Sequence, residues 1–262
     1  MNDVDERLGA EAEFQNARIR AQSDAGEPRD KFYYLLERAF AAYDQAIGEV
    51  AGKDVLVIGC SDVGVLPLAR RGARVFGIDI ADEVIDKLRA SIAAEGLEDS
   101  AQVAVMDAED IDLSRGRFHI VVCSGVLHHL NVERAAKSFQ RVLRPDGRVV
   151  MLEPMAWNPP AAVYRLLTPS MRTPFEHPLT PRDIHLLRRS FGNVMFQGFA
   201  MLSFLSLPFA YIRPLHWATR PVQRALEAVD SLLFRLVPPL RYLAWASVIV
   251  CTNPRGDSAI EN

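Results

Sequence analysis

The middle of the chain, from residue 53 to residue 154, alternates short apolar runs with longer segments of mixed polarity. The apolar runs are rich in Val and Ile: VLVIG, RVFGIDI, QVAVMD, FHIVVCSG and RVVMLEP. Runs of this kind are typical of strands that are buried on both faces of a sheet. The intervening segments place apolar residues at helical spacing, as in DEVIDKLRASIAAEG and NVERAAKSFQRVLRPDG. This alternation predicts an α/β domain with helices on both faces of a mostly parallel sheet.

The pattern changes on both sides of this core. Residues 4–48 have helical character, with an apolar stripe at Phe32, Leu35, Leu36, Ala39, Phe40 and Tyr43. After Pro154 the chain is proline-rich, and a helix is predicted in RDIHLLRRSFGN, ending at Gly192. A sixth strand is expected to start in VMFQGFAMLSF and a last one in YLAWASVIVCTN. We therefore expect a helical N-terminal segment (1–50), a core (51–155), a C-terminal part of the same domain with an apolar insertion (156–253) and a tail (254–262).

Composition and charge narrow the class of protein. Apolar residues make up 49% of the 262 residues, which is ample for a core, and the formal net charge is −3. Residues 1–153 hold 19 basic and 27 acidic residues, whereas residues 154–262 hold 11 basic residues, all arginine, and 6 acidic ones. The acidic larger part argues against general nucleic-acid binding, which needs a concentrated basic face.

The expected location follows from the cysteines and the N-terminus. Cys60, Cys123 and Cys251 each lie in an apolar, strand-like context, which favours buried thiols in a reducing compartment. The N-terminus MNDVDERLGAEAEF is acidic and has no apolar run of the kind found in a signal peptide. These features predict a cytoplasmic protein.

A glycine-containing turn follows the first predicted strand, at Gly59 to Gly64. Such turns place backbone N–H groups and a helix N-terminus against a nucleotide. Here Ser61 and Val63 occupy positions where glycine would be favoured, so the turn alone is also compatible with a degraded dinucleotide fingerprint. Asp79 ends the second strand, at about the spacing at which a carboxylate accepts both ribose hydroxyls of an adenosine. The alternative is a solvated acid at a strand end.

Further polar positions follow the next two strands. Asp107 ends the third strand, and Ser124 to His129 follow the fourth. Taken in order, the segments VLVIGCSDVG, GARVFGID, MDAED, VVCSGVLHHL and RVLRPDGRVVMLEP resemble those of the class I S-adenosylmethionine-dependent methyltransferases. The resemblance covers about residues 50–155, with weaker support from PLTPRDIHLLRRSFGNV.

The resemblance implies a Rossmann-like three-layer sandwich and a cofactor site. In that fold a seven-stranded sheet has its last strand antiparallel, inserted between strands five and six. The N-terminal helical segment would fold over the cofactor, S-adenosyl-L-methionine, as a lid. The implied cofactor contacts are Gly59, Cys60 and Ser61 for the methionine part, Asp79 for the ribose, Ile80, Asp107 and Ala108 for the adenine, and Ser124 and Gly125 beside the sulfonium.

Candidate catalytic residues lie at the ends of strands four and five. An oxygen or nitrogen acceptor must lose a proton during methyl transfer, and an imidazole is suited to act as the base. His128 is the candidate base, ahead of His129, and no metal is expected. Glu153 is expected at the site edge, where it would either orient an acceptor hydroxyl or accept hydrogen bonds from loop amides. A histidine base favours O-methylation over N- or C-methylation.

The acceptor is expected to be set by residues 155–245. Residues 194–212 carry no charge over 19 positions, close to the length of a membrane span, but Gly198 and Pro208 interrupt them. Two interpretations remain: a buried strand and helix, or an apolar surface that touches lipid. Arginines at 213, 220, 224, 235 and 241 lie among aromatic residues, so residues 194–245 are a candidate for peripheral membrane contact.

The sequence thus predicts an S-adenosylmethionine-dependent methyltransferase that acts on a small-molecule, glycan or lipid-linked acceptor. One alternative is an NAD(P)-dependent oxidoreductase built on the same turn, although the chain has no Tyr-x-x-x-Lys pair. The other alternative is a protein that keeps the methyltransferase fold without its catalysis.

Overall fold

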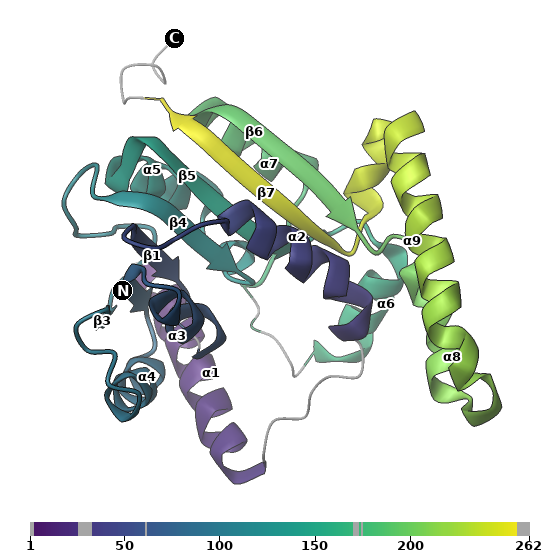
Figure 1. Cartoon of the computed structure of the whole chain (residues 1–262), viewed down its shortest axis with the longest axis horizontal. Coiled ribbons are helices and arrows are strands. Elements are labelled where there is room, and N and C mark those ends of the chain that lie inside the picture. Colours follow the sequence, from purple (N-terminus) through teal and green to yellow (C-terminus); the bar gives the residue numbers. More distant parts are fainter. Residues whose placement is uncertain (1–2, 26–32, 61, 170–172, 174, 256–262) are drawn as a thin grey trace.

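A single seven-stranded sheet organises the structure, a computed structural model that describes residues 3–25, 33–60, 62–169, 173 and 175–255. The strand order is β3-β2-β1-β4-β5-β7-β6, and only β7 runs antiparallel to its neighbours (Figure 1). This confirms the predicted sheet with its last strand inserted between the fifth and the sixth. The strands are β1 (Asp54–Ile58), β2 (Arg74–Asp79), β3 (Ala101–Val105), β4 (Phe118–Ser124), β5 (Leu143–Pro154), β6 (Phe191–Phe199) and β7 (Ala246–Pro254).

Helices cover both faces of the sheet because its central strands are apolar on both sides. In β1, Val55 and Val57 contribute to one core and Leu56 and Ile58 to the other, and all four are buried. The first core is completed by α2 (Glu37–Ile47), α3 (Asp62–Arg70) and α4 (Asp82–Ala94). The second is completed by α5 (Val132–Val142) and α7 (Pro181–Ser190). The result is the three-layer sandwich expected from the sequence (Figure 1).

Two element boundaries differ from the sequence prediction. The helix predicted to end at Gly192 stops at Ser190, because Phe191 already pairs with Pro254 in the antiparallel β6–β7 ladder. Gly192 is therefore a strand residue, and Pro254, predicted to begin the tail, belongs to β7. Residues 256–262 of that tail lie outside the described part of the chain.

Additional helices lie at the edge of the sheet where the parallel strands end. They are α1 (Asp3–Ala25), η1 (Tyr33–Leu36), η2 (Leu127–His129), α6 (Pro159–Leu167), η4 (Ser203–Ser206), α8 (Leu207–Tyr211), η5 (Arg213–Ala218), α9 (Thr219–Leu236) and η6 (Pro238–Leu243). The chain from η4 to η6 fills the connection between β6 and β7, on the right in Figure 1. Within the described ranges, no helix combines the length and apolarity needed to cross a bilayer.

All three cysteines are free and buried, as the sequence predicted. Cys60 is packed at the start of the turn after β1, while Cys123 and Cys251 lie in β4 and β7. Burial raises the pKa of each thiol well above its ordinary value. None of them is therefore a nucleophile at neutral pH.

Candidate active site

Asp79 ties the turn after β1 to the end of β2. One carboxylate oxygen accepts a hydrogen bond from the amide of Cys60 at 2.8 Å, and the other accepts one from the amide of Ala81 at 2.9 Å. Burial raises the pKa of Asp79 above its ordinary value, and these amides act in the opposite direction. Each oxygen retains a lone pair, so the carboxylate can still accept the two hydroxyls of a ribose.

Gly59 is required at its position by a neighbouring side chain. Its φ is +76°, and a Cβ there would come within 2.2 Å of Cγ2 of Val126. The protein itself, rather than a ligand, thus excludes any larger residue. The turn is further fixed by the amide of Gly59, which donates to the carbonyl of Ile78 at 2.9 Å. Ser61, another predicted contact, lies outside the described residues.

The predicted adenine contacts lie beside this turn. The amide of Met106 donates to the carbonyl of Asp79 at 2.9 Å, which holds the end of β3 against the end of β2. Asp107 is half-buried, and its carboxylate accepts the amide of Glu109 at 2.8 Å. Burial raises the pKa of Asp107. Ala108 is buried, and Ile80 is half-buried directly after Asp79. The structure therefore brings these positions together at one edge.

Ser124 and Gly125 form an open step at the end of β4, which is the neighbour of β1. Both residues are exposed, and the amide of Gly125 donates to the carbonyl of Leu152 at 2.9 Å. Gly125 has a φ of +66°, and a Cβ at this position would meet no heavy atom within 4 Å. Backbone and hydroxyl groups are thus accessible where the resemblance places the sulfonium.

Glu153 lies at the end of β5 and is fully buried, with a side-chain exposure of 0%. Its Oε1 accepts the amides of Val126 at 3.1 Å and Leu127 at 2.9 Å, and its Oε2 lies 2.7 Å from Nδ1 of His128. Burial alone would raise the pKa of Glu153, but the hydrogen bond and charge of His128 and the two amides hold it below its ordinary value. Of the two roles considered from the sequence, the structure shows the contact with loop amides. The expected position at the site edge is wrong, because the carboxylate is enclosed.

The imidazole of His128 is oriented by this carboxylate. A carboxylate can only accept, so Nδ1 of His128 donates to Glu153 and Nε2 is the ring nitrogen that remains available. The side chain keeps 10% of its surface exposed. His129 lies beside it, with ring centroids 4.1 Å apart and Nδ1 2.8 Å from Oε1 of Glu11. Each histidine therefore has a carboxylate at its Nδ1.

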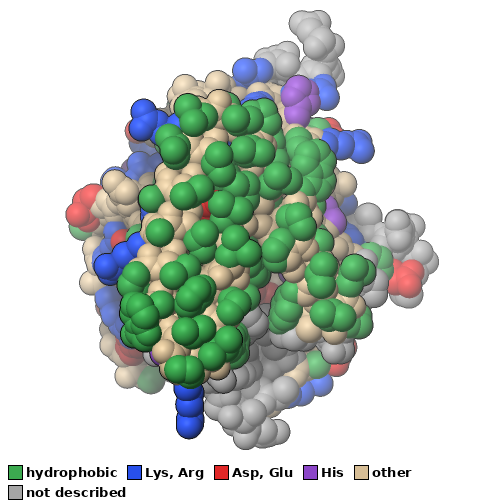
Figure 2. Space-filling view, turned by 90° about the vertical axis from the view of Figure 1, so that its right-hand side faces the viewer, with side chains coloured by type: hydrophobic (Ala, Val, Ile, Leu, Met, Phe, Trp, Pro, Cys, Tyr) green, Lys and Arg blue, Asp and Glu red, His purple; other side chains and the backbone are tan. Residues whose placement is uncertain are grey.

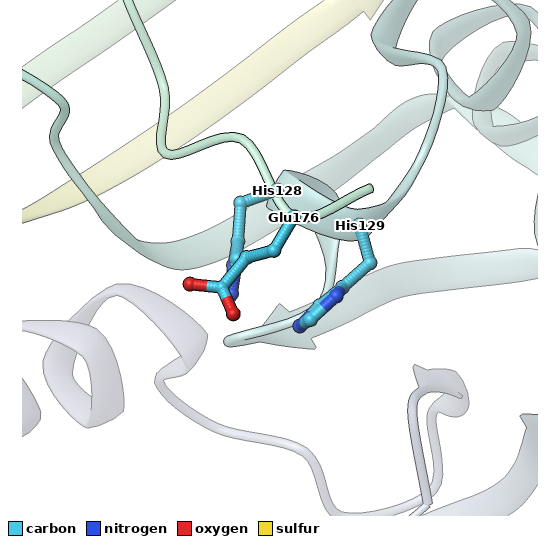
Figure 3. Close-up of side chains that lie close together, drawn as sticks. All are labelled: His128, His129 and Glu176. Atoms are coloured by element: carbon cyan, nitrogen blue, oxygen red, sulfur yellow. The ribbon is translucent and has the colours of Figure 1, made fainter. Parts of the chain in front are cut away.

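One group of side chains in the described ranges has the composition of a cation site. His128, His129 and Glu176 have candidate ligand atoms within 4.8 Å of one another, and their side chains project into a common space (Figure 3). The segment that carries Glu176 is held in place by the amide of His177, which donates to the carbonyl of His128 at 2.8 Å. The contact between Nδ1 of His128 and Glu153 is also of the kind that metal-binding histidines commonly have, whereas Nδ1 of His129 lies 2.8 Å from Oε1 of Glu11 without a hydrogen bond. The sequence alone did not point to Glu176.

Helix α1 crosses this edge of the sheet. Arg7 pairs with the buried Glu109 and donates to the carbonyl of His129 at 2.8 Å, and Glu11 accepts the hydroxyl of Thr173 at 2.6 Å. Further along, Asn16 donates to Asp82 at the start of α4 at 2.8 Å. The sequence offered no signal for Arg7, Glu11 or Glu109, because they are ordinary polar positions until the fold brings them to the site.

Comparisons with known proteins agree with this geometry. Residues 56–151 match the family model described as "Methyltransferase domain", a segment that runs from β1 to β5 and contains the turn, Asp79 and His128. The core of this chain is therefore similar to that family over residues 56–151. The turn alone left open a nicotinamide-dependent oxidoreductase. The family model and the two curated relatives described below do not carry the name of such an enzyme.

Two curated relatives and one solved structure illustrate the similarity. The ubiquinone biosynthesis O-methyltransferase of Shewanella pealeana is 33% identical over 109 residues, which are 40% of this chain and 45% of the relative. The S-adenosyl-L-methionine-dependent Diels-Alderase iccD of Talaromyces variabilis is 33% identical over 108 residues, 39% of this chain and 37% of the relative. The geranyl diphosphate C-methyltransferase of Streptomyces coelicolor A3(2) superposes with a TM-score of 0.57 at 14% identity, over 87% of this chain and 86% of that one.

The matches to the curated relatives cover only part of each protein. The chain spans less than half the length of the curated relatives it matches. At 14% identity, the structural likeness establishes the fold of the methyltransferase domain and its extension to the C-terminal part of the chain. The matches leave the acceptor to be argued from this chain's own residues.

Proposed function

We propose that the protein transfers a methyl group from S-adenosyl-L-methionine to a hydroxyl oxygen. The single observation that carries the choice of oxygen is the His128–Glu153 pair at 2.7 Å, because it leaves Nε2 of His128 to act as the base in the loop that follows Ser124 and Gly125. The match of residues 56–151 to the methyltransferase family supports the reaction class.

The residues at the strand ends fit the cofactor. We assign Asp79 to the ribose hydroxyls, Ile80, Asp107 and Ala108 to the adenine, and the turn from Gly59 through Cys60 and Ser61, with Ser124 and Gly125, to the methionine part. Bound there, the cofactor would supply a methyl group already activated on sulfur. The protein's own contribution is alignment and exclusion of water, and alignment alone can contribute roughly 7–11 kcal/mol.

His128 and Glu153 have separate roles in this mechanism. Nε2 of His128 would accept the proton of the acceptor's hydroxyl, and the bound cofactor would supply the activated methyl group to the oxygen. Glu153 accepts the hydrogen bond from Nδ1 and so leaves Nε2 as the ring nitrogen that can take up a proton. It also stabilises the imidazolium afterwards. Because its carboxylate is enclosed, Glu153 is a positioning residue.

The acceptor belongs to a small-molecule, glycan or lipid-linked class. The name of the Shewanella relative describes an O-methyltransferase of ubiquinone biosynthesis, which is consistent with a hydroxyl on an apolar molecule. Peripheral membrane contact through residues 194–245 would give the protein access to such acceptors. The exposed helices between β6 and β7 support this part of the proposal and are argued in the next subsection.

The test is incubation of the purified protein with cofactor carrying an isotopic label on the methyl group, together with lipid and aqueous metabolite extracts. Mass spectrometry should find the label on an oxygen of an acceptor, and S-adenosylhomocysteine should accumulate with it. A parallel reaction with EDTA distinguishes the two uses of His128. Methyl transfer that survives the chelator supports a base, whereas activity restored only by a divalent ion supports a ligand at His128, His129 and Glu176.

A second candidate function follows from one comparison. The relative of Talaromyces variabilis is named a Diels-Alderase that depends on S-adenosyl-L-methionine. A protein of this kind would bind the cofactor at Asp79 without consuming it. Protection of the protein by S-adenosylhomocysteine against thermal unfolding, with no label transferred to any extract, would favour this function over methyl transfer.

A further inference from the structure

Helix α9 is oriented with its polar residues inside and its apolar residues outside. Its buried residues are Gln223 and Asp230, each 3% exposed. Val229, Leu232 and Leu236 are 43%, 55% and 69% exposed. A helix packed on a globular core normally has the opposite distribution. The apolar stripe of α9 therefore calls for a partner that is not part of the described chain.

Specific hydrogen bonds fix this orientation. The carboxylate of Asp230 accepts hydrogen bonds from the amides of Met201 at 2.9 Å and Leu202 at 3.1 Å. These bonds attach the segment that follows β6 to α9. The side-chain amide of Gln223 donates to the carbonyl of Tyr34 at 2.8 Å. Rotating α9 to bury its leucines would leave these polar groups without partners, at a substantial cost. The exposure of the apolar stripe is thus built into the fold.

Neighbouring helices extend the stripe into a broad surface. The most exposed members are Leu166 at 80%, Leu167 at 76%, Trp217 at 78%, and Leu205 at 61%. We call these four residues, together with Leu232 and Leu236, the apolar face. Figure 2 shows hydrophobic side chains gathered over the side of the molecule on which α8 and α9 lie. Large apolar side chains gathered on one side of a molecule indicate an interaction site, whereas single scattered ones do not.

The charges beside the apolar face are positive. Residues 194–245 contain five arginines and only two acidic residues, Glu227 and Asp230. Asp230 is buried, and Glu227 has a side-chain exposure of 11% and accepts a hydrogen bond from Gln223. Arg213, Arg224 and Arg235 are exposed, and none of them forms an ion pair with another residue in the described ranges. The exposed charges here are therefore mostly those of arginines, with Glu37 of α2, which pairs with Arg220 and lies near Arg224, as a counter-charge.

We propose that the apolar face docks on the surface of a bilayer containing anionic phospholipids. Leucines and Trp217 would enter the boundary between headgroups and acyl chains, while Arg213, Arg224 and Arg235 would lie at the level of the phosphates. A second copy of this chain fits less well, because pairing the face with itself brings like-charged arginines together. An anionic bilayer satisfies both the apolar and the charged components.

The position of this surface connects it with the candidate active site. β5 and β6 run parallel to β4, so α6, η4 and α8 follow strand ends at the same edge of the sheet as Ser124. A hydroxyl acceptor dissolved in the membrane would therefore arrive on the side where the methyl group is transferred. This last step rests on the proposed function, whereas docking itself does not.

Vesicle co-flotation of the full chain, without cofactor or acceptor, tests docking. We expect binding to vesicles of phosphatidylcholine with phosphatidylglycerol and weaker binding to phosphatidylcholine alone, with the difference suppressed by high salt. Trp217→Ala combined with Leu236→Ser should lower binding to both compositions. Arg224→Gln combined with Arg235→Gln should lower only the anionic preference, by about 25-fold if each arginine contributes about fivefold.

A matched control separates docking from general stickiness. Val105, 51% exposed in β3 at the opposite edge of the sheet, is replaced by Ser, and binding should not change. Melting temperatures within the wild-type range confirm that each variant folds. Failure to bind vesicles of either composition would overturn the proposal, as would a stable dimer in solution that the Trp217→Ala, Leu236→Ser variant converts to a monomer. Label transfer to a water-soluble acceptor would leave docking untouched, so the two proposals fail separately.

Discussion

Nδ1 of His128 lies 2.7 Å from Oε2 of Glu153, and the other oxygen of the same carboxylate accepts the amides of Val126 and Leu127. One buried side chain at the end of β5 therefore shapes the loop after β4 and sets the tautomer of the histidine in it. The conformation of the loop and the ability of His128 to accept a proton therefore both depend on one carboxylate. A substitution at Glu153 is for this reason a direct test of the proposed mechanism.

Replacing Glu153 by Gln should lower the rate of methyl transfer while leaving cofactor affinity near the wild-type value. Gln can still accept loop amides through its oxygen, but its NH₂ group would donate to Nδ1 of His128 and place the proton on Nε2. We expect kcat to fall by about 10²- to 10⁴-fold. Stopped assays with labelled cofactor, together with S-adenosylhomocysteine titration, measure the two effects. A variant that loses cofactor binding and rate in parallel would indicate collapse of the loop instead.

Replacing Asp79 by Ala should weaken the binding of S-adenosylhomocysteine about tenfold or more. The change removes charge-assisted hydrogen bonds to the ribose and releases the amides of Cys60 and Ala81. Asp86→Ala, at an exposed position on α4, is the matched control. Calorimetric titration provides the affinities, and unchanged binding in Asp79→Ala would remove the ribose assignment.

The stability of the protein should depend on Glu153 in acid. Its pKa in the fold is below the ordinary value of 4.5, so its stabilising contribution is complete above that pH and is lost as the pH falls through the lower folded value. Between pH 7 and about 5, Glu153 contributes no change of stability with pH. Below that, the melting temperature of the wild type should fall more steeply than that of Glu153→Gln. Asp79 and Asp107, whose pKa values are raised, act in the opposite direction in both proteins and cancel in the comparison.

Gly59→Ala should destabilise the protein more than Gly52→Ala. Both glycines have positive φ, +76° and +70°, so both changes carry the cost of a left-handed Ala, about 1–2 kcal/mol. Only at Gly59 would the new methyl group meet a neighbour, Val126, at 2.2 Å, whereas nothing lies within 4 Å at Gly52. Urea unfolding measures the difference in the free energy of unfolding. Equal losses would mean that Val126 moves aside without cost.

The sheet was predictable because its strands carry their own signal. In β1, β2 and β4, continuous Val and Ile runs end at a polar residue or a glycine, and these ends coincide with Asp79 and Ser124. The family resemblance then supplied the strand order. The boundary at Ser190 was not predictable in this way, because it is set by the pairing of Phe191 with Pro254, which lies 63 positions away and leaves no local trace.

The roles within the site were less accessible. The sequence placed Glu153 at a strand end but could not show on which side of the loop its carboxylate lies, and burial decided that. Arg7, Glu11 and Glu109 meet only because α1 crosses the sheet edge. In α9 the hydrophobic pattern predicts an amphipathic helix without indicating which stripe packs inward, and the hydrogen bonds of Gln223 and Asp230 reverse the usual choice.

The burial of Cys60, Cys123 and Cys251 has a practical consequence. With every native thiol shielded and protonated, a cysteine introduced at Trp217 or Leu236 would be the one that reacts with a maleimide dye or spin probe. The chain therefore lends itself to site-directed labelling without prior removal of its own sulfhydryls. Depth measurements with such probes could follow the orientation of α9 residue by residue.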